Sequence, residues 1–415
     1  MRLLAGKGDG ALWPRRRGGL LALTSKSLLV FLAFGYLVFV HSRIDTRRND
    51  FSAVYLWTAA AQAKLDPYVD DLQWLEEKLG IDANGNSQAN YPPTFIVLFR
   101  PLASLSPEVA YWTWFCLSLV MLTAAMILLF EKEVFWFALL MVLYEPLTDH
   151  FLWAQTYTLL LLLLVLLKRA IGKAWWNSAG LTLGLLGALK IFPFLMVGYL
   201  LRTRRYRSAL LAVGWVVVFA ALTVVLFGFG RSLSFLSSTS FNNWEPWLLA
   251  HSNVSVGAMV TQWIRGYDRA LVGPSSWFFA GLAGCAVLVL TVLRTPSSDP
   301  DGKAFGLWVI TSAALFPICW PSHMVLFVIP FAEIFASRDY APPLAVAFGV
   351  ASYVVSVALV PLHWLLLLQQ FEKGWLYTME RAGLIVLLLT AYSCAFLLVA
   401  PKYDPCTGLR IGPSL

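Results

Sequence analysis

Charged residues are scarce in this chain of 415 residues. Lys, Arg, Asp and Glu together make up 13% of it, against about 25% in an ordinary soluble domain. Hydrophobic residues make up 59%, and the mean hydropathy is +0.69. So little charge argues against a soluble domain and indicates an integral membrane protein. The long apolar runs predict helices that span the membrane, because a membrane barrel would need short alternating strands.

Cysteine is equally scarce, with five residues, and no CxxC pair or Cys/His cluster occurs. This argues against a disulfide framework and a zinc site. The chain also has no DxD-like motif for a sugar nucleotide and no cluster of acids for a metal, so we expect no cofactor and no bound cation. The net charge of +8 comes from basic residues between apolar runs. Membrane topology explains that placement better than a nucleic-acid partner does.

A transmembrane helix needs about 20 apolar residues. The run 175–201 is too long for one span, and Pro193 interrupts it, which predicts two helices turning at that point. About twelve spans result, with both termini cytoplasmic, because the basic sequence RTRRYR (202–207) then lies inside. Apart from 175–201, the expected spans are 25–41, 108–130, 134–148, 151–168, 207–229, 276–293, 304–319, 323–336, 342–361 and 378–400. The N-terminal segment has the charge of a signal peptide but no cleavage site, and we interpret it as leading into a retained first span.

We treat 1–415 as a single membrane domain with two long outer segments, 42–107 and 230–275. The first contains NDFSAVYLWTAAAQAKL, which predicts a helix capped by Asn49 or Asp50. This helix is too short to span, so we expect it to lie along the membrane surface.

Several polar residues are expected to gather at the outer face, and each also has a structural interpretation. Asp50 could serve only as a helix cap, the pair Asp149–His150 reads as an ordinary turn, and Gln155 could bond only to a neighbouring helix. Lone histidines such as His323 and His363 are more often structural than catalytic. The remaining polar stretch is HSNVS, residues 251–255.

Lys190 stands out because it lies at the predicted helix break, near membrane depth. Ionisable groups at that depth are costly and are usually paired or functional. A cation beside an outer cavity suits a lipid-linked phosphate, because it offsets negative charge where water is scarce. The structural alternative is that the side chain snorkels to the interface.

These elements occur in the order NDFSAVYLWTAAAQAKLDPY, YPPTFIVLFRPL, WAQTYTLLLLLL, AGLTLGLLGALKIFPFL, HSNVSVGAMV and SHMVLFVIPF. In this order the chain, from about residue 45 to 340, resembles glycosyltransferase family 87. The resemblance implies a polyprenyl-phosphate-mannose-dependent mannosyltransferase with the C-type glycosyltransferase architecture: an all-α polytopic fold with helices on the outer face.

The resemblance also implies roles for individual residues. Asp50 falls on the catalytic base, and Lys190 and His323 fall on positions that would contact the donor phosphate. Two departures are visible: Val54 stands where the first tyrosine of the DFxxYY-like block is usual, and Ala154 replaces the glycine of the GQ-type block. Residues in the matching blocks that would contact substrate are Tyr55, Tyr91, Gln155, Asn253 and Ser255.

The expected reaction is transfer of a hexose, mannose on the resemblance, from a polyprenyl-phosphate-linked donor to an envelope glycan or glycolipid. It would take place at the outer face of the cell membrane, among membrane lipids, with inversion at the anomeric carbon. The alternative from another class is a flippase or transporter of lipid-linked sugars, which internal repeats would favour. A non-catalytic scaffold and a polymer ligase of related architecture stay open as further alternatives.

Overall fold

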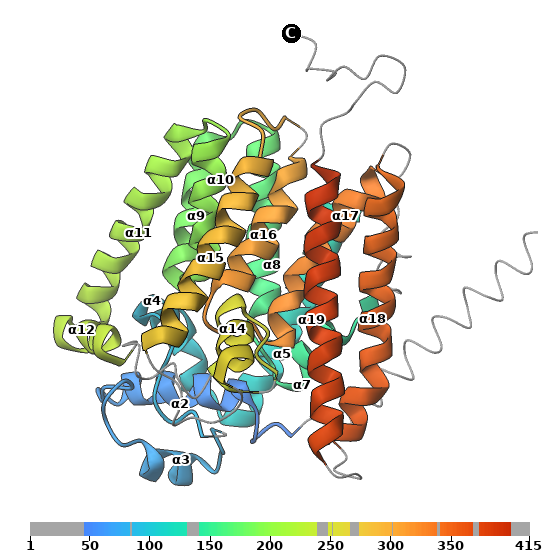
Figure 1. Cartoon of the computed structure of the whole chain (residues 1–415). Coiled ribbons are helices and arrows are strands. Elements are labelled where there is room, and N and C mark those ends of the chain that lie inside the picture. The colour runs from blue at the N-terminus through green and yellow to red at the C-terminus, as the bar shows by residue number, and fades with distance from the viewer. Residues whose placement is uncertain are drawn as a thin grey trace, which may run out of the picture.

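The computed structural model is entirely helical in the part of the chain that it describes, apart from an isolated bridge between Arg48 and Asp82 (Figure 1). The expected first span, 25–41, lies outside this part, as do His251 and Arg338. The described residues are 45–83, 85–130, 141–238, 248–250, 252–265, 274–300, 302–337, 341–367 and 373–399.

Five of the described helices are long and apolar enough to cross a membrane, so the chain is a multi-pass membrane protein. The predicted total of about twelve spans is not confirmed. The five helices are α5 (Pro107–Phe130), α11 (Tyr206–Phe227), α15 (Pro274–Arg294), α18 (Pro343–Leu367) and α19 (Lys373–Leu398).

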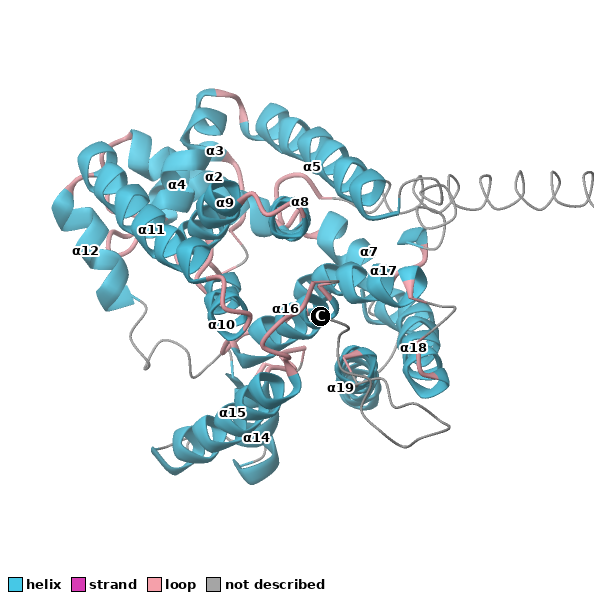
Figure 2. Ribbon diagram, turned by 90° about the horizontal axis from the view of Figure 1, so that it is seen from above, coloured by secondary structure: helices cyan, strands magenta, loops and turns pink. Residues whose placement is uncertain are grey.

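Shorter helices fill the middle of the bundle, and the long ones lie mostly around them (Figure 2). They are α8 (Tyr157–Gly172), α9 (Trp176–Leu189), α10 (Met196–Arg202), α16 (Lys303–Leu315) and α17 (Val328–Ala336). Two 3-10 segments interrupt these helices, η3 (Phe192–Leu195) and η6 (Pro321–Phe327). The predicted break at Pro193 is therefore confirmed. Some apolar runs form helices shorter than a full span because the helix gives way to a 3-10 segment or a loop.

The helix α7 (Glu145–Leu152) corrects one prediction. We expected the chain to turn at Asp149–His150 between two spans, but both residues lie within this helix. The turn comes later, at residues 153–156, and Pro146 at the helix start explains the difference, since proline is favoured in a first turn.

One end of the bundle carries the helices of the outer segments (lower part of Figure 1). They are α2 (Asp50–Gln62), α3 (Gln73–Leu79), α4 (Pro93–Phe99), η1 (Arg100–Ser104), α12 (Phe229–Ser238) and α14 (Val256–Arg265). We expected α2 to lie on the membrane surface, but 10 of its 13 residues are buried. It packs against α4, η1 and α5, and its small alanine side chains allow close contact.

Basic residues gather at the opposite end. Arg202 donates a hydrogen bond from Nε to the carbonyl of Val292 at 3.0 Å, and Arg205 donates to the carbonyl of Asp299 at 2.9 Å. Close by, Lys168 forms a partly buried ion pair with Glu333. The loops after α8, α10 and α15 therefore meet at one end, where basic residues predominate, whereas acidic residues outnumber basic ones in the outer segment 45–107.

Two glycines bring α9 and α11 into close contact. A Cβ atom at Gly184 would lie 2.5 Å from the Cβ of Trp215 and 2.9 Å from the carbonyl oxygen of Ala212. One turn earlier, a Cβ atom at Gly180 would lie 2.5 Å from the Cβ of Leu211. This is the small-xxx-small arrangement by which helices pack closely in membranes. The contact holds α9, and with it Lys190 at its end, in a fixed position.

We expect Gly184→Ala to destabilise the protein by about 1–3 kcal/mol, because the added methyl group forces the two backbones apart. Gly214→Ala, in α11, is the matched control, since nothing lies within 4 Å of a Cβ atom at Gly214. Thermal unfolding in detergent measures both variants. Equal unfolding temperatures for the two would show that the helix contact does not limit stability.

Candidate active site

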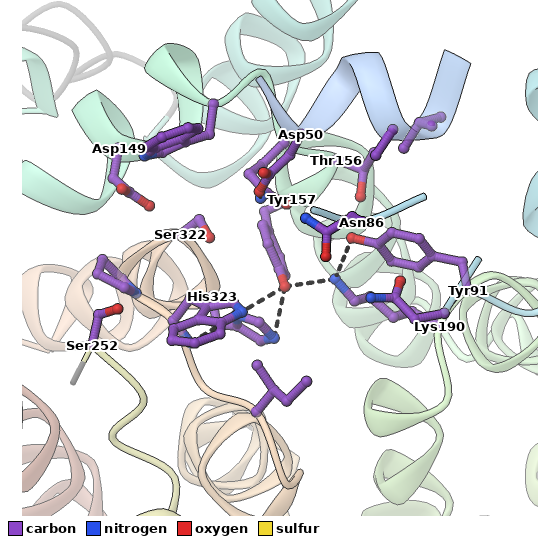
Figure 3. A pocket seen from close by; sticks show the side chains of 18 of the residues that line it. Asp50, Asn86, Tyr91, Asp149, Thr156, Tyr157, Lys190, Ser252, Ser322 and His323 are labelled. Carbon is purple, nitrogen blue, oxygen red and sulfur yellow. Dashed lines mark hydrogen bonds between the residues drawn. The ribbon is translucent and has the colours of Figure 1, made fainter. Parts of the chain in front are cut away.

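A cavity of about 470 Å³ opens at the end of the bundle that carries α2. Its wall is built by α2, α7, the loop between α7 and α8, the break after α9, and η6 (Figure 3). Five residues predicted from the sequence as functional lie together in this wall. They are Asp50, Tyr91, Gln155, Lys190 and His323.

Asp50 occupies the first position of α2, but it does not cap the helix. The side chain of Asn49 is the cap, and its Oδ1 accepts a hydrogen bond from the backbone N–H of Ser52 at 3.0 Å. The capping interpretation of Asp50 is therefore wrong, and its carboxylate is directed to the cavity (Figure 3). There it accepts a short hydrogen bond from Nε2 of Gln155.

The electrostatic environment of Asp50 suits a group that exchanges protons near neutral pH. Burial raises its pKa to about 7, the negative charge of Asp149 contributes in the same direction, and the positive charge of Lys190 opposes both. An ordinary surface aspartate, with a pKa near 4, would be a much weaker base. A carboxylate with a pKa near the working pH is well matched to general-base chemistry.

Lys190 reaches the cavity from the break between α9 and η3, where its backbone is extended, with φ −152° and ψ 128°. The residue is 7% exposed, and its ammonium group donates hydrogen bonds to the hydroxyls of Tyr157 at 2.5 Å and Tyr91 at 3.2 Å. The same group lies over both rings, 4.0 Å and 4.6 Å from their centroids. Two ion pairs occur in the described ranges, and neither includes Lys190. The cation is held by neutral groups and can attract an anion.

Tyr157 links Lys190 to His323. The backbone N–H of Trp320 donates to Nδ1 of the histidine at 3.1 Å, so the ring proton belongs on Nε2, which lies 2.6 Å from the tyrosine hydroxyl. The tyrosine oxygen also lies 2.8 Å from Nδ1, so it contacts both ring nitrogens of His323 as well as the ammonium group of Lys190. Sequence reasoning missed Tyr157, because a tyrosine at the start of a leucine-rich helix looks like an ordinary core residue.

Tyr91 lines the cavity, as predicted for a substrate contact, but three other predicted residues do not. The hydroxyl of Tyr55 donates to the carbonyl of Leu105 at 2.6 Å. Asn253 and Ser255 both donate to the carbonyl of Pro317, at 2.8 and 2.9 Å. These side chains hold the loops around the cavity in place. Among the described residues of the stretch 251–255, Ser252 reaches the cavity.

The family model for glycosyltransferase family 87 matches residues 90–321, more than half of the chain. The chain belongs to glycosyltransferase family 87. No curated protein matches it. Membership makes it a membrane glycosyltransferase. The matched range includes Gln155, Tyr157 and Lys190. Asp50 lies 40 residues before this range and His323 two residues after it, and both are connected to it by the contacts described above.

In this glycosyltransferase the missing glycine of the GQ-type block has a visible consequence. Ala154 has a φ of 49°, in the left-handed region, and a non-glycine residue there costs about 1–2 kcal/mol. The strained turn is held by the indole N–H of Trp114, which lies 3.2 Å from the carbonyl oxygen of Ala154 and 3.3 Å from that of Gln155. The turn directs the side chain of Gln155 to Asp50.

We expect Ala154→Gly to raise the thermal unfolding temperature or leave it unchanged, because relief of the left-handed strain offsets the greater freedom of glycine in the unfolded chain. Ala60→Gly, at a buried helical position of α2, is the matched control and is expected to be destabilised by at least about 0.5–1 kcal/mol. An equal loss of stability in both variants would mean that position 154 is not strained.

Proposed function

We propose that this glycosyltransferase moves a hexose, mannose in the first instance, from a polyprenyl-phosphate-sugar donor to a hydroxyl of an envelope glycan or glycolipid. The observation that carries the proposal is the buried ammonium group of Lys190, which has no carboxylate partner at ion-pair distance in the described chain and faces the cavity that also holds Asp50. Lys190, which would bind the anion, and Asp50, which would act as the base, thus line a single cavity.

The donor phosphate fits beside Lys190. An ammonium group shielded from water attracts a phosphate far more strongly than an exposed one does. The hydroxyl of Tyr91 is placed to donate to a phosphate oxygen, while Tyr157, itself in contact with His323, holds the ammonium group in position. Ile191, next to the lysine, lines the cavity and is 52% exposed. The isoprenoid chain would leave the cavity past this exposed apolar side chain.

Asp50 is proposed as the general base. The carboxylate takes the proton of the acceptor hydroxyl as its oxygen forms a bond to the anomeric carbon. The bond from that carbon to the phosphate oxygen breaks with its electron pair, and polyprenyl phosphate leaves beside Lys190. One displacement of this kind inverts the anomeric centre. The leaving group is already good, so a base and stabilisation of the departing charge are the main requirements.

Asp50→Asn is expected to lower the transfer rate by about 10²–10⁴-fold, because the amide cannot accept the proton. Stability should be unchanged, since Asn49 supplies the helix cap. The wild-type rate should rise with pH and level off above about 7, as Asp50 loses its proton. The residual rate of Asp50→Asn should not show this rise with pH. The assay follows labelled polyprenyl-phosphate-mannose with membrane extract as the source of acceptor.

Asp66→Asn is the control for this experiment, because Asp66 lies in the same outer segment but does not line the cavity. Near-normal transfer by Asp50→Asn would move the base to another outer-face carboxylate, Asp149 first. Absence of transfer by the wild-type protein from any polyprenyl-phosphate sugar, together with movement of such lipids across vesicle membranes, would favour the transporter alternative.

The proposal places the cavity on the outer face of the cell membrane, with both termini in the cytoplasm. Its support is the separation of the basic loops from the cavity end, since Lys and Arg are enriched in cytoplasmic loops. The C-type glycosyltransferase architecture is part of the same proposal.

We expect single cysteines at positions 71 and 237 to react with an impermeant maleimide in intact cells, and cysteines at 204 and 298 to react only after lysis. All four positions are exposed. The native cysteines, of which Cys116 and Cys285 are exposed, are first replaced by alanine. Labelling of position 204 in intact cells would reverse the assigned orientation.

A further inference from the structure

The cavity has a second polar face, formed by Asp149, Ser252 and Ser322. These three residues line the cavity from α7, from the loop before α14, and from η6. In Figure 3 they lie on one side of His323, and Lys190 with Tyr91 lies on the other. None of the three is used in the transfer chemistry proposed above.

Ser322 is the clearest sign that this face binds a ligand. The residue is 1% exposed, and its hydroxyl has no hydrogen-bond partner in the described part of the protein. A buried hydroxyl without a partner costs about 1–3 kcal/mol. Because Ser322 lines the cavity, a ligand there can supply the missing hydrogen bond.

Asp149 defines which ligands suit this face. It is 6% exposed, and its negative charge acts on Asp50, so the two carboxylates share one cavity. A phosphate is repelled by this pair of acids and attracted by Lys190. Groups that donate hydrogen bonds without carrying negative charge are favoured beside Asp149. A serine hydroxyl can both donate and accept, which matches the hydroxyls of a sugar.

Two tryptophans complete the face. Trp153 follows α7 directly, Trp320 precedes η6, and both line the cavity. Their flat apolar surfaces suit the C–H face of a sugar ring, while the polar groups suit its hydroxyls. On the Lys190 side, by contrast, the hydroxyls of Tyr91 and Tyr157 contact the ammonium group.

We propose that Asp149 and Ser322, with Ser252, form the acceptor subsite, which binds an uncharged, polyhydroxylated sugar ring. The ring is oriented so that one hydroxyl reaches Asp50 while its neighbours bond to Asp149 and Ser322. Asp149 and Ser322 are positioning residues. The assignment rests on the proposed function. It implies that the sugar residue of the acceptor that receives the hexose carries no charge.

Binding to the purified full-length protein in nanodiscs tests the assignment without requiring transfer. The probes are methyl α-D-mannopyranoside, followed by saturation-transfer NMR, and undecaprenyl phosphate, followed by native mass spectrometry. Asp149→Asn and Ser322→Ala are expected to weaken sugar binding by about tenfold, as for loss of a hydrogen bond in a buried site, with binding of undecaprenyl phosphate unchanged. Lys190→Met is expected to show the reverse pattern.

Ser118→Ala is the matched control, because Ser118 also has a buried hydroxyl without a partner in the described residues but does not line the cavity. It should bind both probes like the wild type. If Asp149→Asn does not fold, sugar binding by Ser322→Ala alone tests the subsite. Unchanged sugar binding by Ser322→Ala, equal weakening of both probes, or no sugar binding by the wild type would overturn the subsite. Normal binding of undecaprenyl phosphate by Lys190→Met would instead contradict the donor site and leave the acceptor subsite standing.

Discussion

The structure around the cavity depends on keeping one ammonium group out of water. A buried charge costs several kcal/mol unless nearby groups compensate for it. For Lys190 the compensation comes from two tyrosine hydroxyls and the faces of their rings. Tyr157 must therefore begin its helix at the cavity, and His323 must lie beside it. The break in the α9–η3 segment, the start of α8 and the segment η6 all converge on this group.

The same constraint gives the cavity its polarity. Lys190 lies to one side and Asp149 to the other, with Asp50 between them (Figure 3). A donor with a negatively charged phosphate and an acceptor with hydroxyl groups would thus enter with fixed orientations. Charge repulsion between Asp149 and the phosphate of the proposed donor would prevent the opposite arrangement. Specificity then follows from the placement of a few charges in a poorly hydrated space.

The sequence predicted the features that depend on local chemistry. Proline is disfavoured in a helix interior, so Pro193 made the break beside Lys190 visible, and a lysine at such a break is conspicuous in an apolar chain. Other features depend on which side of a helix faces the protein. Apolar and small residues occur all around α2, so its pattern does not show that neighbouring elements cover it on nearly every side. For the same reason Tyr157 could not be distinguished from its leucine neighbours. Asn253 and Ser255 were assigned to the substrate because they are polar, whereas they hold the chain at Pro317.

The most direct test of the central claim is the position of the phosphorus atom in an experimental structure with bound polyprenyl-phosphate-mannose. The account predicts that phosphate oxygens lie within hydrogen-bond distance of Nζ of Lys190, about 2.7–2.9 Å, with the anomeric carbon facing Asp50. A phosphate bound at the opposite end of the bundle, among Arg202, Arg204 and Arg205, would contradict it. So would a phosphate within the cavity on the side of Asp149.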